Sequence, residues 1–442
     1  MRRIGLAAVV LCSLAGAAGA NGRPPGTDSI EFKQGTTSST DIIAGLTFGL
    51  IISHDSGATW QWMCEAAVGY QGTYDPVYAY SQSGAIFATT FDGFTAMRDG
   101  CTFNNYATTP PGTTFVSADV LGPDHALYYG AADMHDANVY RSADDGMTFP
   151  QVWQSGLNQP WWESVMVAPS DATRVYLSGY LLANNTKSFL LYTSVDGGKT
   201  FTALPQTGLT DAANSAISIV GVSPTDPTLV YVRVTLENNV LGDGIYKMKV
   251  GTDTSWTRIF GKLDSVFFVA RANGDIVAIT PTLGGSVSHD QGATWTVLTS
   301  PPHANCLTES PDGWVWACSQ NYGQNGIQSD GYGIMKSQDL ATWTGVIRYQ
   351  DISGPVSCAP GTVQHDTCDA MTWCSLRMQL GIIPNPTNCP DTSGSEPSDA
   401  KSTGKTGSAG CCDTGAGGGP VALLGSLMVG ALLVRRRRAK LG

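Results

Sequence analysis

Five acidic residues lie in polar segments that are also rich in amides and aromatic rings. They are Asp133, Asp136, Glu163, Glu237 and Asp330. Hydrolysis of a glycosidic bond needs only two carboxyl groups at a fixed separation, one to donate a proton and one to act as a base or nucleophile. These residues are therefore our candidates for catalysis. The alternative is that they cap turns or are solvated, as acidic residues in polar loops commonly are.

A second set of residues could bind a ligand without catalysing a reaction. It comprises Trp161, Trp162, Asn184, Asn238, Asn239 and Tyr322. Amides combined with aromatic rings suit polar, uncharged ligands such as glycans or extended peptides, whereas carboxylates and phosphates are best bound by arginine. We expect the tandem tryptophans to be exposed, although such a pair can also be buried against a neighbouring element.

Both sets are embedded in a repeat. Four segments follow the pattern Ser-x-Asp-x-Gly-x-Thr-Trp/Phe and end at Trp60, Phe149, Phe201 and Trp295, and three weaker copies end at Phe103, Trp256 and Trp343. The copies recur roughly every 40–50 residues, which is the length of one four-stranded propeller blade. In each strong copy the aspartate can accept backbone hydrogen bonds within its own turn, and the glycine permits a left-handed backbone.

The motif resembles the Asp box of bacterial-neuraminidase (BNR) repeats, which occurs in sialidase-like and sortilin-like propellers. Together with the period, it predicts an all-β fold, a single seven-bladed β-propeller of four-stranded antiparallel blades over residues 21–350. The motif would form the hairpin between the third and fourth strands, so Asp55, Asp144, Asp196 and Asp290 are expected to be structural. Loops at the opposite face would carry the ligand site. Whether residues 29–34 begin the first blade or complete the last one stays open.

A sialidase should contain three arginines that clamp the substrate carboxylate. Arg98 and Arg141 lie within or beside a motif copy, at the wrong face, and the Arg-Ile-Pro phrase typical of sialidases is absent. The sequence therefore disfavours a sialidase. A glycoside hydrolase with another carboxylate pair, or a degenerate sialidase, stays as the alternative.

The two ends of the chain indicate export. Two arginines, an apolar run from Ile4 to Ala17 and a small-x-small step at Ala20 predict a signal peptide over residues 1–20. Residues 390–412 form a polar linker ending in Cys411 and Cys412. Residues 413–442 contain an apolar run and an arginine cluster, which together read as a transmembrane sorting tail.

The order of cysteine, apolar helix and arginine cluster resembles the myxosortase-type C-terminal sorting signal (MYXO-CTERM) of myxobacterial surface proteins. The resemblance implies that a sorting protease acts at Cys411 or Cys412 and leaves the propeller at the cell surface, on the outer membrane. The alternative is a simple single-pass membrane anchor.

Eight further cysteines are even in number, as expected for disulfides in an exported protein. They are Cys64, Cys101, Cys306, Cys318, Cys358, Cys368, Cys374 and Cys389. We expect Cys64 to pair with Cys101 and Cys306 with Cys318, and the last four to pair among themselves in a Cys-rich extension over residues 351–389. No CxxC pair occurs there, so disulfides are favoured over zinc, and neither a metal nor a cofactor is expected.

The formal net charge of −11 disfavours a nucleic-acid-binding protein. The sequence therefore predicts an exported, surface-anchored and monomeric recognition propeller that binds a glycan or a protein or peptide ligand. The alternative function is a surface glycoside hydrolase.

Overall fold

The computed structural model describes residues 23–70, 74–90, 93–105, 116–132, 137–184, 186–210, 213–324 and 326–382. Several predicted features lie outside these residues: the signal peptide, the linker with Cys411 and Cys412, the sorting tail, Asp133, Asp136 and Cys389. No helix in the described part of the chain is both long enough and apolar enough to cross a bilayer.

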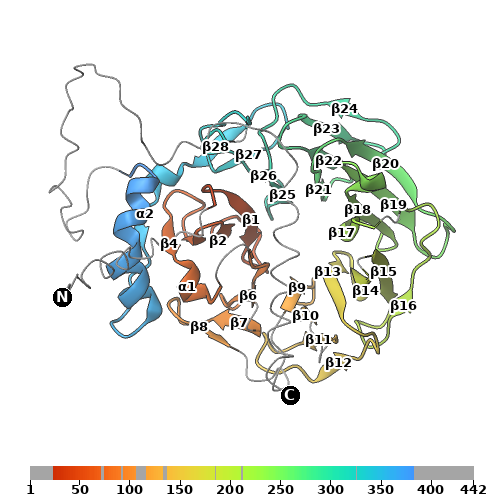
Figure 1. The fold of residues 1–442 in the computed structure, drawn as a ribbon, viewed down its shortest axis with the longest axis horizontal. Coiled ribbons are helices and arrows are strands. Elements are labelled where there is room, and N and C mark those ends of the chain that lie inside the picture. Colours follow the sequence, from red (N-terminus) through yellow and green to blue (C-terminus); the bar gives the residue numbers. More distant parts are fainter. Residues whose placement is uncertain are drawn as a thin grey trace, which may run out of the picture. The chain divides into compact units, whose positions relative to one another are not determined.

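The described residues form seven antiparallel sheets around a ring (Figure 1). Blade 1 contains β1 (Thr27–Phe32), β2 (Ile42–Leu46), β3 (Gly49–Ser53) and β4 (Gln61–Met63), and blade 2 contains β5 (Tyr78–Tyr80), β6 (Ile86–Thr90), β7 (Gly93–Met97) and β8 (Phe103–Asn105). Blade 3 contains β9 (Val116–Leu121), β10 (Leu127–Ala131), β11 (Val139–Ser142) and β12 (Gln151–Trp153), and blade 4 contains β13 (Pro160–Ala168), β14 (Asp171–Ala183), β15 (Thr186–Ser194) and β16 (Thr202–Ala203).

Blade 5 contains β17 (Ala216–Val222), β18 (Leu229–Thr235), β19 (Asp243–Lys249) and β20 (Thr257–Lys262), with the 3-10 turn η1 (Glu237–Asn239) between β18 and β19. Blade 6 contains β21 (Phe267–Ala270), β22 (Ile276–Ile279), β23 (Gly285–Ser288) and β24 (Thr296–Val297), and blade 7 contains β25 (Cys306–Glu309), β26 (Val315–Cys318), β27 (Ile334–Ser337) and β28 (Thr344–Ile347). The predicted propeller of seven four-stranded antiparallel blades is confirmed.

The middle strands of a blade are buried on both faces because each blade packs between two others. All five residues of β2 and all five of β3 are buried. These strands therefore consist almost entirely of apolar and small residues rather than alternating with polar ones. The outermost strands are short and more exposed, as both residues of β16 show.

Each blade is built from one contiguous stretch of chain, so no strand is shared between the first and last blades. β1 pairs with β2, which makes it the innermost strand of blade 1 and settles the point that the sequence left open. Direct contacts join this strand to blade 7 and the residues after it. The hydroxyl groups of Thr27 and Tyr349 are hydrogen-bonded at 2.8 Å, and the rings of Phe32 and Trp316 meet edge to face.

After β28 the chain continues along the outside of blade 1, as the blue segments in Figure 1 show. It forms η2 (Tyr349–Asp351), β29 (Gly354–Pro355), the π-helix η3 (Gln364–Thr372) and α2 (Trp373–Gln379), next to α1 (Glu65–Val68). β29 adds a fifth, parallel strand to β4. The side-chain amide of Gln364 donates to the Trp62 carbonyl, and the Trp62 ring lies 5.4 Å from that of Trp373. We call residues 349–382 the C-terminal clasp.

Two disulfides fix the C-terminal clasp to the first two blades. Cys64 pairs with Cys368 and Cys101 with Cys358, so the predicted Cys64–Cys101 bridge is wrong, and so is pairing only among the last four cysteines. The sequence could not reveal this because each bridge joins residues more than 250 positions apart. Cys306 pairs with Cys318 across β25 and β26 as expected. Cys374 is also disulfide-bonded, to a partner outside the described residues.

The repeated motif forms the turn between the third and fourth strands, and its aspartate organises that turn. In the first copy, Asp55 accepts a 2.6 Å hydrogen bond from the Thr59 hydroxyl, one of 2.8 Å from the Thr59 backbone N–H and one of 2.9 Å from the Ser53 hydroxyl. Gly57 has a φ of 86° and donates to the Ser53 hydroxyl. The same bonds recur around Asp144, Asp196 and Asp290.

These hydrogen bonds make the turns sensitive to acid. Donation by the Thr59 hydroxyl, then by its backbone N–H, lowers the pKa of Asp55 to about 2. A carboxyl whose pKa is depressed by folding stabilises the protein above its unfolded pKa, and that contribution is lost as the pH falls through the folded value. We expect Asp55→Ala to lower the melting temperature by a few degrees at pH 7 and by less at pH 2. The control is Asp369→Ala, which removes an exposed acid from the C-terminal clasp; an equal loss in both variants would contradict a specific role for the turn.

The C-terminal clasp should contribute measurably to stability. Replacing Cys101 and Cys358 by alanine should lower the free energy of unfolding by about 2–5 kcal/mol, since this bridge restricts a long stretch of unfolded chain. Urea unfolding under non-reducing conditions measures the change. Replacing Cys306 and Cys318, which lie only 12 residues apart, should cost less. Equal losses of unfolding free energy in the two double variants would contradict the idea that a disulfide stabilises by restricting the unfolded chain.

Candidate functional site

The direction of the strands gives the propeller two different faces. Third strands run toward the motif turns, so these turns and the turns between first and second strands share one face, which we call the turn face. The loops between second and third strands and between blades share the other, which we call the loop face. Among the connections between second and third strands, the longest described ones are residues 236–242 in blade 5 and 319–333, apart from residue 325, in blade 7.

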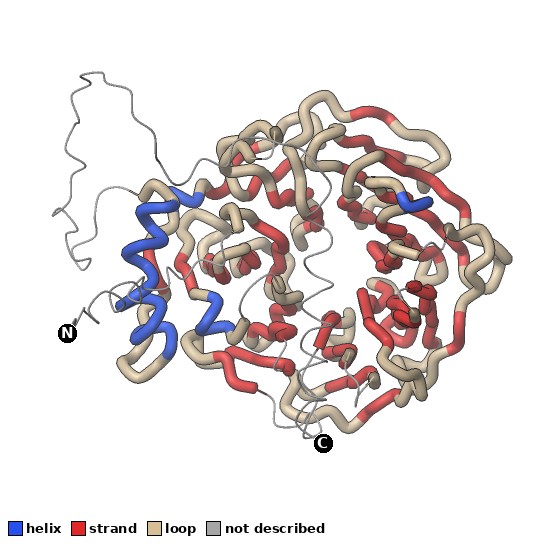
Figure 2. The backbone as a smooth tube through the Cα atoms, viewed as in Figure 1, coloured by secondary structure: helices blue, strands red, loops and turns tan. Residues whose placement is uncertain are grey.

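The innermost strands of the seven blades face the centre of the ring (Figure 2), and we call the two cavities that lie there the channel. A cavity of about 440 Å³, chamber 1, lies on the side of blades 1 to 4, and one of about 350 Å³, chamber 2, lies on the side of blades 4 to 7 and also touches β1. The two share Glu163 and Ser164 of β13. Chamber 1 is lined by Glu31, Phe32, Gln34, Val77, Tyr78, Ala79, Tyr80, Val120, Leu121, Glu163, Ser164, Val165 and Met166. Chamber 2 includes Asp28, Arg233, Ser218, Phe267 and Asn305 in its lining.

β-Bulges place two of the acidic side chains in the channel. The register of β1 against β2 shifts between Thr27 and Ser29, and that of β13 against β14 shifts between Trp162 and Ser164. The extra residues at these bulges are Asp28 and Glu163. A bulge interrupts the alternation of a strand and redirects a side chain. Both residues line chamber 2 as a result.

Enclosure in the channel makes these carboxyl groups weak acids. Burial raises the pKa of Glu31 to about 8. Burial, and then the negative charge of Asp75, raise the pKa of Asp28 to about 7, with Arg23 opposing the rise. Burial also raises the pKa of Glu163, although the charges of Lys187 and Arg233 oppose it. Most of Glu31 and a large fraction of Asp28 are therefore neutral at pH 7.

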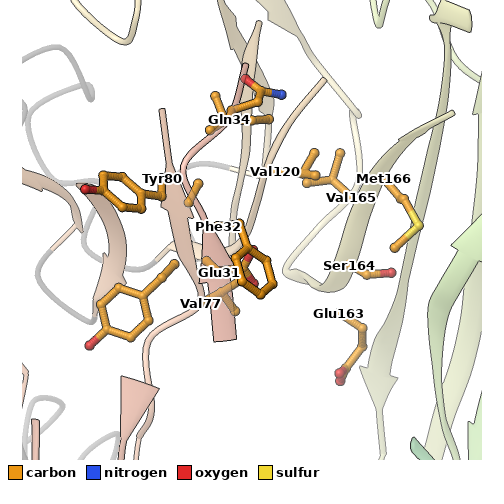
Figure 3. A pocket seen from close by; sticks show the side chains of 13 residues that line it. Glu31, Phe32, Gln34, Val77, Tyr80, Val120, Glu163, Ser164, Val165 and Met166 are labelled. Atoms are coloured by element: carbon orange, nitrogen blue, oxygen red, sulfur yellow. The ribbon is translucent and has the colours of Figure 1, made fainter. Parts of the chain in front are cut away.

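The turn-face end of chamber 1 is braced by Gln34. Its backbone N–H donates to the Tyr80 carbonyl at 3.0 Å, and its side-chain amide donates to the Gly122 carbonyl at 2.5 Å. Its amide oxygen lies 2.9 Å from Nδ1 of His125. Figure 3 shows Gln34 at one end of the chamber and Val77 and Glu163 toward the other. Val77 directly precedes β5, is exposed and lies on the loop-face side of the chamber.

Two of the predicted ligand-binding aromatics do not face the channel. The Trp162 side chain is 0 % exposed and its indole N–H donates to the Ala137 carbonyl, so the expected exposure of Trp162 is wrong. Trp161 and Trp162 are consecutive residues of β13 in regular register, so their side chains point to opposite sides of the strand and both cannot be exposed on the same side. Tyr322 is half-buried and its hydroxyl donates to the Leu380 carbonyl in the C-terminal clasp. Trp161 is half-buried and stacks on Tyr180.

The three predicted asparagines are exposed on the loop face but line neither chamber. Asn184 lies between β14 and β15, and Asn238 and Asn239 lie in η1. All three have positive φ angles, which asparagine tolerates better than most residues. Their backbone conformation alone explains the choice of residue at these positions.

Two predicted catalytic residues are bound to protein partners. Glu237 is buried, receives the Tyr246 hydroxyl and two guanidinium nitrogens of Arg258, and its pKa is lowered because these bonds outweigh its burial. Asp330 accepts hydrogen bonds from the backbone N–H groups of His303 and Gln320 and contacts the His303 ring. Of the predicted acids that the structure describes, only Glu163 lines the channel.

The sequence did not single out Asp28, Glu31 or Arg233 as functional residues. Asp28 and Glu31 are on β1, whose place in the ring could not be decided from the repeat, and Arg233 comes from a second strand, β18. The available signal was weak: two acidic residues within one short strand of six residues. Within the described ranges, no group of three or more His, Cys, Asp or Glu side chains is arranged to hold a metal ion.

No family model matches the chain, and no curated protein matches it. Among solved structures, the chain is similar to the extracellular domain of BT4673 from B. thetaiotaomicron, with 14 % identity over 71 % of this chain and 38 % of that one and a TM-score of 0.48. It is also similar to PorZ, a bacterial surface component of the type-IX secretion system of Porphyromonas gingivalis, with 14 % identity over 70 % and 46 % and a TM-score of 0.48.

YCF48 from Cyanidioschyzon merolae is similar with 14 % identity over 66 % of this chain and 92 % of that one and a TM-score of 0.44. The chain thus spans less than half the length of the BT4673 and PorZ chains that it matches.

The two tryptophans should behave differently when replaced. Trp162→Ala should lower the free energy of unfolding by about 3–5 kcal/mol because it empties a buried site between blades 3 and 4. Trp161→Ala serves as the matched control and should cost much less, since Trp161 is partly exposed. Chemical unfolding of the two variants measures both values. A larger loss in Trp161→Ala would contradict the assignment of their environments.

Proposed function

We propose that this protein is an exported recognition propeller, anchored at the cell surface, which binds a glycan or a peptide segment of another protein at the loop face and in the channel. The observation that carries the proposal is chamber 1. It is large enough for part of a ligand, its wall is mostly apolar and aromatic, and it contains acidic side chains without a hydrogen-bonding partner among the described residues. Such a mixture is typical of binding pockets.

The two faces differ in a way that supports this location. On the turn face, the four strongest motif copies form hydrogen bonds within their own turns, and in each copy the aspartate accepts a bond from the threonine of the same turn. On the loop face, asparagines and the half-buried Trp161 remain near the channel end of blade 4 and blade 5. Loops held on a rigid scaffold are common binding surfaces.

Export is supported by the cysteines. Three disulfides are present among the described residues, and disulfides of this kind form in oxidising compartments. The signal peptide and the MYXO-CTERM-like tail that the sequence predicts would place the propeller on the outer membrane, after a sorting protease acts at Cys411 or Cys412. The Asp-box resemblance, the monomeric state and the absence of a cofactor remain parts of the same proposal.

A second candidate function is hydrolysis of a glycan. The observation in its favour is that Glu31 and Glu163 line the same chamber with aromatic residues, which is the combination a glycosidase requires. A carboxyl group with a raised pKa is protonated at neutral pH and suits a general acid. A sialidase fits less well, because the described lining of the two chambers includes one arginine, Arg233, rather than a cluster of three.

Glycan and peptide arrays probed with residues 21–389 test the proposal. We expect saturable binding to one ligand class, with at least a tenfold loss in Val77→Trp, because a large ring at this partly exposed position narrows the entrance of chamber 1. Met147→Trp is the control, since Met147 is exposed in a turn on the opposite face. Undiminished binding by Val77→Trp would place the site elsewhere. Release of sugar from the bound glycan, abolished by Glu163→Gln, would instead favour the hydrolase.

A further inference from the structure

We propose that chamber 1 binds a primary ammonium group carried by the ligand, with Glu31 and Glu163 as its counter-ions. The inference rests on the proposed recognition function and specifies the ligand chemistry. Glu31 comes from blade 1 and Glu163 from blade 4, and Figure 3 shows their strands on two walls of the same chamber. A cation that enters between these walls meets carboxyl oxygens contributed by separate blades.

The described lining of the chamber includes no positively charged side chain. None of the thirteen residues that line it is a lysine or an arginine. Lys187 and Arg233, whose charges oppose the rise in the pKa of Glu163, also contact other groups. Lys187 lies 4.0 Å above the Tyr180 ring, and Arg233 lines chamber 2, where it donates to the Val266 carbonyl and lies beside Asp243. Because neither carboxyl group has a hydrogen bond or salt bridge to any described residue, a ligand can supply the missing partner.

The remaining wall suits an alkyl chain that carries the charge. Phe32 and Tyr80 contribute rings, and Val120, Val165 and Met166 contribute aliphatic surface. An ammonium group near aromatic rings gains from their negative faces, and its methylene groups gain from leaving water. A neutral sugar would gain less from this wall, and an anion would face two acids without a compensating arginine.

Burial favours the neutral form of Glu31, which avoids the cost of an unpaired buried charge. The titratable groups that line the chamber with Glu31 are Glu163 on β13 and Tyr78 and Tyr80 on β5, while Asp28 and Arg233 lie in chamber 2. When the ammonium group enters, Glu31 ionises beside it and its proton passes to the solvent. The ligand keeps its own proton, so binding forms one ion pair and releases up to one proton per ionised carboxyl group.

Titration calorimetry of the full-length protein with pentylammonium tests the proposal, with pentan-1-ol as the uncharged ligand of the same length. Pentylammonium should bind and pentan-1-ol should not. The affinity for pentylammonium should rise about fivefold between pH 7 and pH 8, because Glu31 ionises in this range while the amine stays charged. The heat at pH 7 should depend on the ionisation enthalpy of the buffer, which reports the released proton.

Glu31→Gln should weaken pentylammonium binding roughly tenfold and remove most of the proton release, since the charged partner is lost while the shape is kept. The control, Asp369→Asn, removes one exposed acid from the C-terminal clasp and should change neither quantity. Melting temperatures of both variants show that they are folded. Equal binding of pentan-1-ol, an affinity that falls as the pH rises, or unchanged binding in Glu31→Gln would overturn the proposal.

Competition separates this inference from the proposed function. If pentylammonium displaces the array ligand, the ligand itself supplies the ammonium group, and spermidine and a lysine-containing tripeptide then distinguish a polyamine from a peptide source. If the array ligand binds, is lost in Val77→Trp and is unaffected by pentylammonium, the recognition function stands and the ammonium site is wrong. If no array ligand binds but pentylammonium does, the ammonium site stands and the proposed recognition of a glycan or peptide is wrong.

Discussion

Closure of the ring is the constraint on which the channel depends. Seven sheets can pack in a circle only if the first and last hold together, and here no strand is shared between them. The C-terminal clasp supplies the missing connection by running from blade 7 along the outer edge of blade 1, where β29 pairs with β4. Its helices join the largest apolar core of the protein, which includes residues of blades 1, 2 and 7. The two long-range disulfides then prevent the clasp from detaching.

This arrangement couples a distant segment to the candidate site. β1 carries Asp28 and Glu31 and is also the strand that meets blade 7, through the hydrogen bond between Thr27 and Tyr349. Tyr349 begins the C-terminal clasp, and its ring packs against Phe48 in blade 1. Loosening the clasp would therefore displace the strand that holds two of the three channel acids. The clasp acts on the channel by fixing this strand rather than by touching a ligand.

The repeat made the architecture predictable, because each motif copy needs the same turn and each turn ends the third strand of a blade. The period of the repeat does not indicate where the chain runs after the last blade. The disulfide partners of Cys64 and Cys101 lie in that segment, so the repeat could not predict them. It also could not reveal local departures from strand alternation. Asp28 is not identified for this reason, since it is the extra residue of a bulge. The burial of Trp162 has another cause, because consecutive residues of a strand point to opposite sides and Trp161 takes the more exposed side. The repeat therefore predicted the blades but not the residues that face the channel.

The acids of this protein fall into two groups that burial alone does not separate. Glu237 is more completely buried than Glu31, yet its pKa is lowered, because Arg258 and Tyr246 satisfy the carboxylate. Glu31 has no such partner among the residues that the structure describes, and burial raises its pKa. A carboxyl group paired within the protein stabilises the fold, whereas one left unpaired costs stability whenever it ionises. Retaining unpaired acids on innermost strands is therefore hard to explain by folding, and a ligand that supplies the opposite charge removes the difficulty.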